Sequence, residues 1–164
     1  MPNGAARSNP AIGVLFVCTG NICRSPTAEA VLRYKVEAAG LGERVRVASC
    51  GTHDYHVGDP PDPRAQAHAA RRGYDLSRLR ASCLADEDPA LYDLIVALDR
   101  GHERILRRRV GPEKVRLLTS WLDDTETEDV PDPYYGGPDD FERALDLIER
   151  ACEGLLAELQ RRLG

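Results

Sequence analysis

The chain has 164 residues, of which 42% are hydrophobic and 30% are charged, and its formal net charge at pH 7 is -5. This composition is typical of one globular domain, and it argues against general binding to nucleic acids or to anionic membranes. The longest apolar runs are too short to span a bilayer, and residues 1–10 lack the apolar centre of a signal peptide.

The cysteines indicate the redox compartment. The chain contains five of them, an odd number that fits a framework of structural disulfides poorly. In a chain without an export signal, free thiols are typical of the cytosol. We therefore expect a cytoplasmic protein with a disordered lead-in at 1–10 and a single domain at 11–164.

Short apolar runs alternate with stretches of helical periodicity along the chain. Buried strands, rich in β-branched residues, are expected at 12–17, 45–48, 93–98 and 115–118. Helices are expected at 26–39, 64–72, 99–108 and 141–163. This alternation predicts a parallel sheet covered by helices on both faces, with ligands bound beyond the carboxyl ends of the strands.

The segment between the first strand and the first helix carries the chemistry. Cys18 and Arg24 form a C-x5-R pattern around Gly20 and Asn21, and Ser25 is expected to cap the helix that follows. A short loop entering a helix directs backbone N–H groups at an anion, and arginine adds a planar fork for phosphoryl oxygens. Helix N-termini and arginine also favour the thiolate form of a cysteine. We therefore expect Cys18 to act as a nucleophile in phosphoryl transfer.

Four stretches resemble, in order, the low-molecular-weight protein tyrosine phosphatases. They are residues 17–29, 57–65, 97–99 and 132–136. The resemblance implies an α/β fold of three layers, with a central four-stranded parallel sheet in the order 2-1-3-4. It also implies helices on both faces of the sheet and a phosphate-binding loop directly after the first strand.

The resemblance further implies roles for particular residues. Cys18 would attack phosphorus, Arg24 and the loop amides would bind the phosphoryl oxygens, and Asp132 would act as general acid and then as general base. The phosphate-binding residues would be Thr19, Gly20, Asn21, Ile22, Cys23, Arg24 and Ser25. The substrate slot would be walled by Ile22, Tyr55, Tyr134 and Tyr135.

Two of these roles leave an alternative open. Cys23 would protect an oxidised Cys18 as a reversible disulfide, or else contribute only its backbone N–H to the loop. From the residues alone, the pair Asp132-Pro133 in an acidic loop is more often a simple turn. Its neighbours favour a role as an acid, because crowded carboxylates favour a protonated group among them. Those neighbours are Glu126, Glu128 and Asp129.

Two other enzymes share this type of loop. An arsenate reductase relays oxidation through a nearby cysteine pair, whereas Cys83 has no close partner in the sequence. Phosphoarginine phosphatases carry threonine at the position of Ile22, and an apolar rim suits a phenyl ring better. Tyrosine-phosphorylated proteins are therefore the expected partners, with inorganic phosphate as product and inhibitor.

Two further readings belong to other classes of protein. A silent phosphate-binding module is disfavoured because nucleophile, arginine and acid are all present. A metal site is suggested by the C-x2-H-x2-H spacing of Cys50, His53 and His56, but three ligands in a loop do not match a closed zinc site. We expect a monomer that uses no metal or other cofactor and binds neither nucleic acid nor membrane.

Overall fold

The computed structural model describes residues 10–122 and 129–164. Its strands are β1 (Ile12–Cys18), β2 (Val45–Gly51), β3 (Leu94–Ala97) and β4 (Val115–Leu117). Its helices are α2 (Arg24–Ala38), α3 (Pro63–Ala70), α4 (Arg100–Val110) and α5 (Pro138–Leu163). The expected lead-in lies outside the described residues except for Pro10, and Glu126 and Glu128 lie outside them as well.

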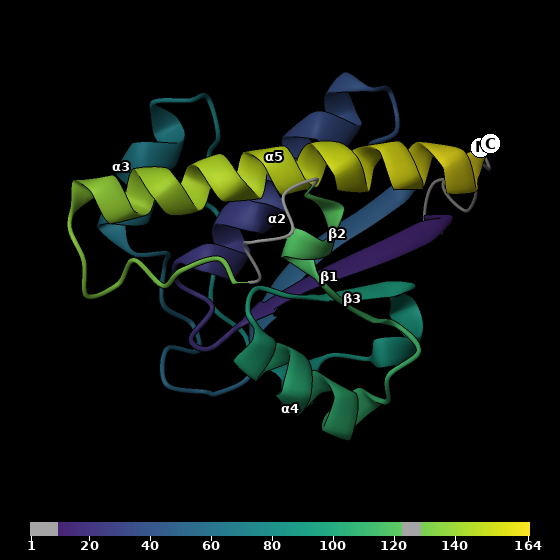
Figure 1. Ribbon diagram of the computed structural model, residues 1–164, viewed down its shortest axis with the longest axis horizontal. Coiled ribbons are helices and arrows are strands. Elements are labelled where there is room, and N and C mark those ends of the chain that lie inside the picture. Colours follow the sequence, from purple (N-terminus) through teal and green to yellow (C-terminus); the bar gives the residue numbers. More distant parts are fainter. Residues whose placement is uncertain (1–9, 123–128) are drawn as a thin grey trace.

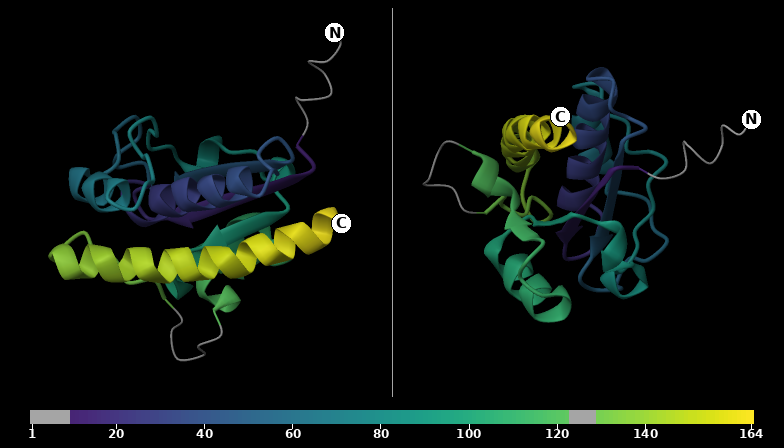
Figure 2. Two further views of the ribbon diagram at one scale, coloured as in Figure 1. Left: turned by 90° about the horizontal axis from the view of Figure 1, so that it is seen from above. Right: turned by 90° about the vertical axis from the view of Figure 1, so that its right-hand side faces the viewer.

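The four strands form one parallel sheet in the order β2-β1-β3-β4, which confirms the expected topology. Helices α2 and α5 lie on one face of the sheet and α4 lies on the other (Figures 1 and 2). The molecule therefore has three layers, and β1 occupies a central position in the middle layer.

Strand β1 is buried along its whole length because its side chains enter two different cores. Val14 and Phe16 pack on the side of α2 and α5, whereas Leu15 and Val17 pack on the side of α4. Successive side chains of a strand point to opposite faces, so a strand covered on both sides reads as an unbroken apolar run. The C-terminal end of this fixed strand positions the loop that follows.

Helix α5 presents one apolar face to the sheet and to α2. Phe141, Leu145, Ile148 and Leu155 on this face are all buried. The helix begins at Pro138, earlier than expected. Its start is stabilised by the Asp140 side chain, which accepts a hydrogen bond of 2.8 Å from the N–H of Gly137, the N-cap residue. No helix in the described part of the chain combines the length and apolar character needed to cross a bilayer.

Helix α2 corrects one expectation. It begins at Arg24 with Cys23 in the N-cap position, and no side chain caps it. The assignment of Ser25 as the cap was wrong, because its hydroxyl turns inward and lies 2.9 Å from Cys18 Sγ. The helix therefore begins two residues closer to the loop than local capping preferences indicate.

Candidate active site

A cavity of about 270 Å³ opens at the carboxyl ends of the strands, beside the loop between β1 and α2. It is lined by Cys18, Thr19, Gly20, Ile22, Cys23, Arg24, Tyr55, His56, Asp132, Tyr134 and Tyr135. Every residue in this set except His56 was expected from the sequence. The other two expected loop residues, Asn21 and Ser25, are buried and do not line the cavity.

Cys18 ends β1, and its thiol contacts the side chain of Ser25 in the first turn of α2. The residue is only 4% exposed, and Ser25 Oγ lies 2.9 Å from its sulfur. Asn21 Nδ2 donates to the same oxygen at 2.8 Å, which leaves the Ser25 hydroxyl hydrogen for another acceptor. The competing carbonyl of Cys50 is farther away, at 3.4 Å. The Ser25 hydroxyl and the N-terminus of α2 can therefore stabilise a thiolate at this position.

Asn21 connects the loop to two neighbouring segments. Its backbone has a φ of 59°, in the left-handed region that Asn tolerates better than most residues. Its Nδ2 also donates to Ser49 Oγ at 2.9 Å, and its Oδ1 accepts from the N–H of Ser82 at 2.9 Å. These contacts to β2 and to the segment after α3 are those expected of a residue that braces the loop.

Arg24 is held by partners distant in sequence. Its guanidinium is 5% exposed, and Nη1 donates to Asp99 Oδ2 at 2.9 Å and to the carbonyl of Val130 at 2.8 Å. The Asp99 carboxylate also caps α4 by accepting from the N–H of His102 at 2.8 Å. Although burial opposes it, this N–H, the His102 ring and Arg24 together lower the pKa of Asp99. Asp99 was not among the expected site residues.

Asp132 lines the cavity close to Arg24. Its Oδ2 is 3.6 Å from Arg24 Nη2, its Oδ1 accepts from the N–H of Tyr134 at 3.1 Å, and its side chain is 47% exposed. Of the three acidic neighbours expected to keep it protonated, only Asp129 is described. Asp129 accepts from the N–H of Arg100 at 2.8 Å, so its charge is directed to the start of α4.

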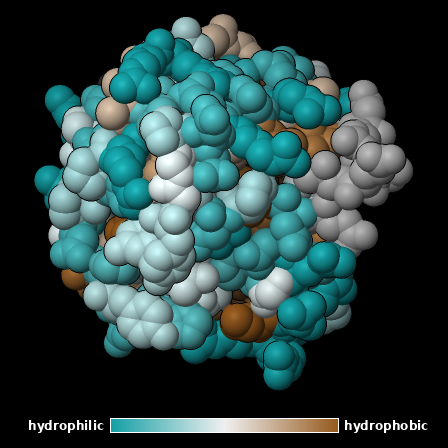
Figure 3. All heavy atoms as spheres, turned by 60° about the vertical axis from the view of Figure 1, so that its left-hand side comes forward, coloured by the Kyte–Doolittle hydropathy of each residue, from teal (hydrophilic) through white to brown (hydrophobic). Residues whose placement is uncertain are grey.

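Aromatic side chains form the outer walls. Tyr55 is 70% exposed and stacks on His53, with centroids 5.0 Å apart. Tyr134 and Tyr135 meet edge to face at 4.8 Å, and the guanidinium of Arg64 lies over the Tyr134 ring. The side of the molecule turned forward in Figure 3 is otherwise mostly hydrophilic, and its apolar residues show as small separate areas.

His56 is the lining residue that the sequence reading missed. Its ring edge covers Gly20 so closely that a Cβ added there would lie 2.9 Å from His56 Cδ2. Its Nδ1 lies 3.2 Å from Asp59 Oδ2. The sequence signal was available, because His56 directly follows Tyr55 in the loop after β2. The spacing of His56 with Cys50 and His53 instead suggested a metal site.

The metal reading gains no support from the arrangement of these side chains. Cys50 is fully buried in the core on the α4 side of the sheet, whereas His53 is exposed and bonds Thr52 through Nδ1. Within residues 10–122 and 129–164, no group of three or more His, Cys, Asp or Glu side chains could hold a metal ion.

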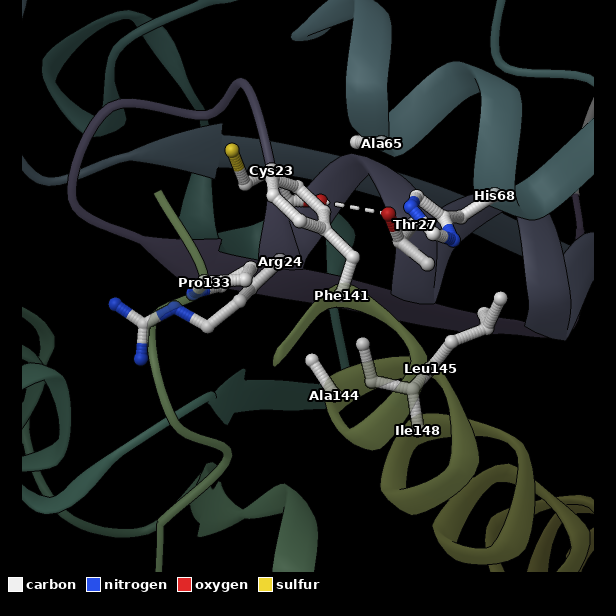
Figure 4. Close-up of a pocket in the computed structure, with 10 residues that line it drawn as sticks. All are labelled: Cys23, Arg24, Thr27, Ala65, His68, Pro133, Phe141, Ala144, Leu145 and Ile148. Carbon is white, nitrogen blue, oxygen red and sulfur yellow. Dashed lines mark hydrogen bonds between the residues drawn. The ribbon is translucent and has the colours of Figure 1, made fainter. Parts of the chain in front are cut away.

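A second, much smaller cavity lies behind the loop (Figure 4). Its volume of about 20 Å³ is close to that of a single water molecule, so it is a packing gap rather than a ligand site. Phe141 on α5 and His68 on α3 stack across it, with ring centroids 5.5 Å apart. Cys23 lines it too, and burial, followed by the charge of Asp62, raises the pKa of this thiol. Cys23 is therefore held as a neutral thiol beside the nucleophile.

Residues 13–163 match the sequence model of a family described as low molecular weight phosphotyrosine protein phosphatase. The chain belongs to this phosphatase family. A low molecular weight protein-tyrosine-phosphatase of Streptomyces coelicolor is 49% identical over 156 residues, which cover 92% of this chain and 94% of that protein. The family and the enzyme class expected from the sequence are confirmed.

Solved structures agree with this assignment. The crystal structure of YfkJ from Bacillus subtilis is similar to this phosphatase with a TM-score of 0.87 and 35% identity, over 94% of this chain and 98% of YfkJ. DARP, a Drosophila arginine phosphatase, is similar with a TM-score of 0.82 and 31% identity, over 89% of this chain and 96% of DARP. The fold is therefore shared with a protein that is named as an arginine phosphatase.

Proposed function

We propose that this phosphatase hydrolyses phosphotyrosine in proteins, and small aryl phosphates, through a cysteinyl-phosphate intermediate. One observation carries the proposal: Cys18, Arg24 and Asp132 line a single cavity that lies at a helix N-terminus between aromatic walls. A dianionic phosphate is favoured at such a helix N-terminus, and a phenyl ring is favoured between the tyrosines.

In the first step, the Cys18 thiolate attacks phosphorus, so that an S–P bond forms and the P–O bond to tyrosine breaks. The loop amides and Arg24 hold the phosphoryl oxygens and stabilise the charge of the transition state. Arg24 is oriented for this task because Nη1 is fixed by Asp99 and Val130, while Nη2 faces Asp132. Asp132 gives its proton to the departing phenolate oxygen, and a neutral tyrosine leaves.

In the second step, the now ionised Asp132 removes a proton from a water molecule. The water oxygen attacks phosphorus, the S–P bond breaks, and inorganic phosphate leaves while Cys18 returns to its thiolate form. Because phosphate then occupies the same loop as the substrate, it is both the product and a competitive inhibitor.

The substrate preference follows from the walls of the cavity. Ile22 gives the loop an apolar rim, and Tyr55 and Tyr134 line the same cavity. These surfaces favour an aryl ester over phosphoarginine, whose guanidinium would lose hydration without gaining a carboxylate partner at the apolar rim. Tyrosine-phosphorylated proteins are therefore the proposed substrates, and the monomeric state and cytoplasmic location stay predictions.

Cys23 is proposed as a guard of the nucleophile. A peroxide oxidises the Cys18 thiolate to a sulfenic acid. The Cys23 thiol then gives up its proton as its sulfur attacks the Cys18 sulfur, so that a disulfide forms and the sulfenic hydroxyl leaves with that proton as water. A cellular thiol reductant restores both cysteines. The proposal is supported by the position of both side chains on the same cavity.

The test compares p-nitrophenyl phosphate, a phosphotyrosine peptide and a phosphoarginine peptide in the presence of a metal chelator. Wild type should hydrolyse the two aryl esters, and Cys18→Ser should be inactive on both while keeping its affinity for phosphate. Activity in Cys18→Ser would refute the mechanism, and a faster reaction with the phosphoarginine peptide would refute the substrate assignment. Loss of wild-type activity to the chelator would indicate a metal enzyme instead.

Asp132 is tested by the leaving group. Asp132→Ala should slow hydrolysis of phosphotyrosine far more than hydrolysis of an ester whose phenol is already a good leaving group, since only the former needs a proton donor. Equal losses on both esters would remove Asp132 as the general acid. Asp129→Ala is the matched control, because its carboxylate is engaged with α4 and should not change this ratio.

A further inference from the structure

His102 is a buried side chain that the proposed mechanism leaves unused. It lies in the first turn of α4 and is only 4% exposed, although α4 is otherwise rich in exposed arginines. Its Nε2 lies 2.8 Å from Thr19 Oγ1, and Thr19 is the residue that follows the nucleophile and lines the cavity. A histidine that packed only as a core residue would not need this polar contact across 83 residues of chain.

His102 is also connected to the other end of the loop, through Asp99 and Arg24. Asp99 Oδ1 accepts from the backbone N–H of His102 at 2.8 Å and lies 3.1 Å from His102 Nδ1. Asp99 Oδ2 accepts from Arg24 at 2.9 Å. Thr19, His102, Asp99 and Arg24 therefore form a ring with the loop itself. The backbone from 19 to 24 is one side of the ring, and the side chains of Asp99 and His102 are the other. A ring of this kind fixes the distance between Thr19 and Arg24, which sets the width of the anion-binding loop.

The two nitrogens of His102 are not equivalent. Nδ1 is buried and, despite its closeness to Asp99, makes no properly directed hydrogen bond within the described structure, whereas the contact of Nε2 with Thr19 is well directed. The donor in the contact between Nε2 and Thr19 Oγ1 depends on the tautomer: Nε2 donates when it carries the proton, and it accepts from the Thr19 hydroxyl when the proton is on Nδ1, which faces Asp99. The hydrogen bond itself is present in both cases.

We propose that His102 is a positioning residue of the phosphatase: the hydrogen bond between its Nε2 and Thr19 Oγ1 holds the phosphate-binding loop at the spacing that the transition state needs. The inference rests on the proposed function, because it assigns a purpose to the loop's shape. His102 itself touches neither the substrate nor the reacting atoms.

A double-mutant cycle tests this inference with p-nitrophenyl phosphate. His102→Leu and Thr19→Val should each lower kcat by roughly three- to tenfold, the equivalent of one hydrogen bond, while KM changes less. The double variant should be no slower than the slower single variant, because both changes break the same contact. His102→Gln, whose amide nitrogen can occupy the place of Nε2, should recover most of kcat.

The outcomes separate positioning from simple packing. Multiplied losses in the double variant, or a His102→Gln variant as slow as His102→Leu, would overturn the proposal. His68→Gln is the matched control, since His68 is also a buried histidine, at 8% exposed, but lies on α3. An equal loss of kcat there would show that any buried histidine matters and would also overturn it. Activity in Cys18→Ser, measured in parallel, would instead reject the proposed function. The same cycle of His102 and Thr19 variants would then be measured as affinity for inorganic phosphate, where multiplied losses would again overturn the proposal.

Discussion

The buried ring of His102 makes the stability of this phosphatase sensitive to acid. Burial, opposed by the nearby charge of Asp99, lowers the pKa of His102 from 6.5 to about 4. Arg24 lowers it further, while the more distant Asp132 and Asp129 raise it. The folded protein therefore keeps this histidine neutral at a pH where the unfolded chain has already taken up a proton.

The sign and size of the effect follow from this difference. Between pH 6.5 and pH 4 the unfolded state binds more protons than the folded state, so the free energy of unfolding falls as the pH falls. Above pH 6.5 the histidine is neutral in both states, so the folded protein has its full stability with respect to this group. For a single histidine with these two pKa values, the loss between pH 7 and pH 5 is about 2 kcal/mol.

The assay is urea unfolding of wild type and His102→Gln at pH 7, 6 and 5. Other titrating groups contribute equally to both proteins, so the difference between their unfolding free energies isolates His102. At pH 7 wild type should be the more stable of the two. The difference should shrink by about 2 kcal/mol on reaching pH 5, because the variant has no proton to take up at this position.

A difference that stays constant between pH 7 and pH 5 would refute the reasoning. It would mean that His102 is protonated in the folded state as readily as in the unfolded chain. His53→Gln is the control, because this histidine is exposed. That variant should keep the full acid sensitivity of wild type.

Three other predictions follow from the same geometry. Asp99→Asn should lower the free energy of unfolding by about 2 kcal/mol by removing the closer of the two carboxylates beside Arg24, and added phosphate should restore part of the loss; no loss would mean that Asp132 and the Val130 carbonyl suffice. Peroxide treatment followed by peptide mapping should find a Cys18–Cys23 disulfide, and Cys23→Ser should recover less activity on reduction; equal recovery would end the protective role. Leu155→Ala, fully buried on α5, should cost about 3 kcal/mol of stability while kcat at 20 °C changes little, and a large fall in kcat would show that α5 packing controls the loop.

Local patterns in the sequence are enough to identify most of the strands and helices and the loop that carries the nucleophile. The apolar run at 12–17 could be identified as a doubly buried strand because both faces of β1 are covered, and the alternation of elements gave the parallel sheet. Cys18 and Arg24 could be named because seven consecutive residues contain the whole C-x5-R pattern. Features of this kind depend on neighbours within a few residues, and local propensity and periodicity report such neighbours directly.

The contacts that hold that loop in place become visible only in the folded chain. Ser25 has the chemistry of a helix cap, but its hydroxyl serves the Cys18 sulfur instead, since the fold brings that sulfur within 2.9 Å. Arg24 bonds Asp99 and Val130, which lie 75 and 106 residues away, and Thr19 bonds His102 across 83 residues. No local pattern encodes such partners, because they meet only where separate strands end at one edge of the sheet. The nucleophile can thus be identified from a short stretch of sequence, whereas the contacts that position it form only when the chain has folded.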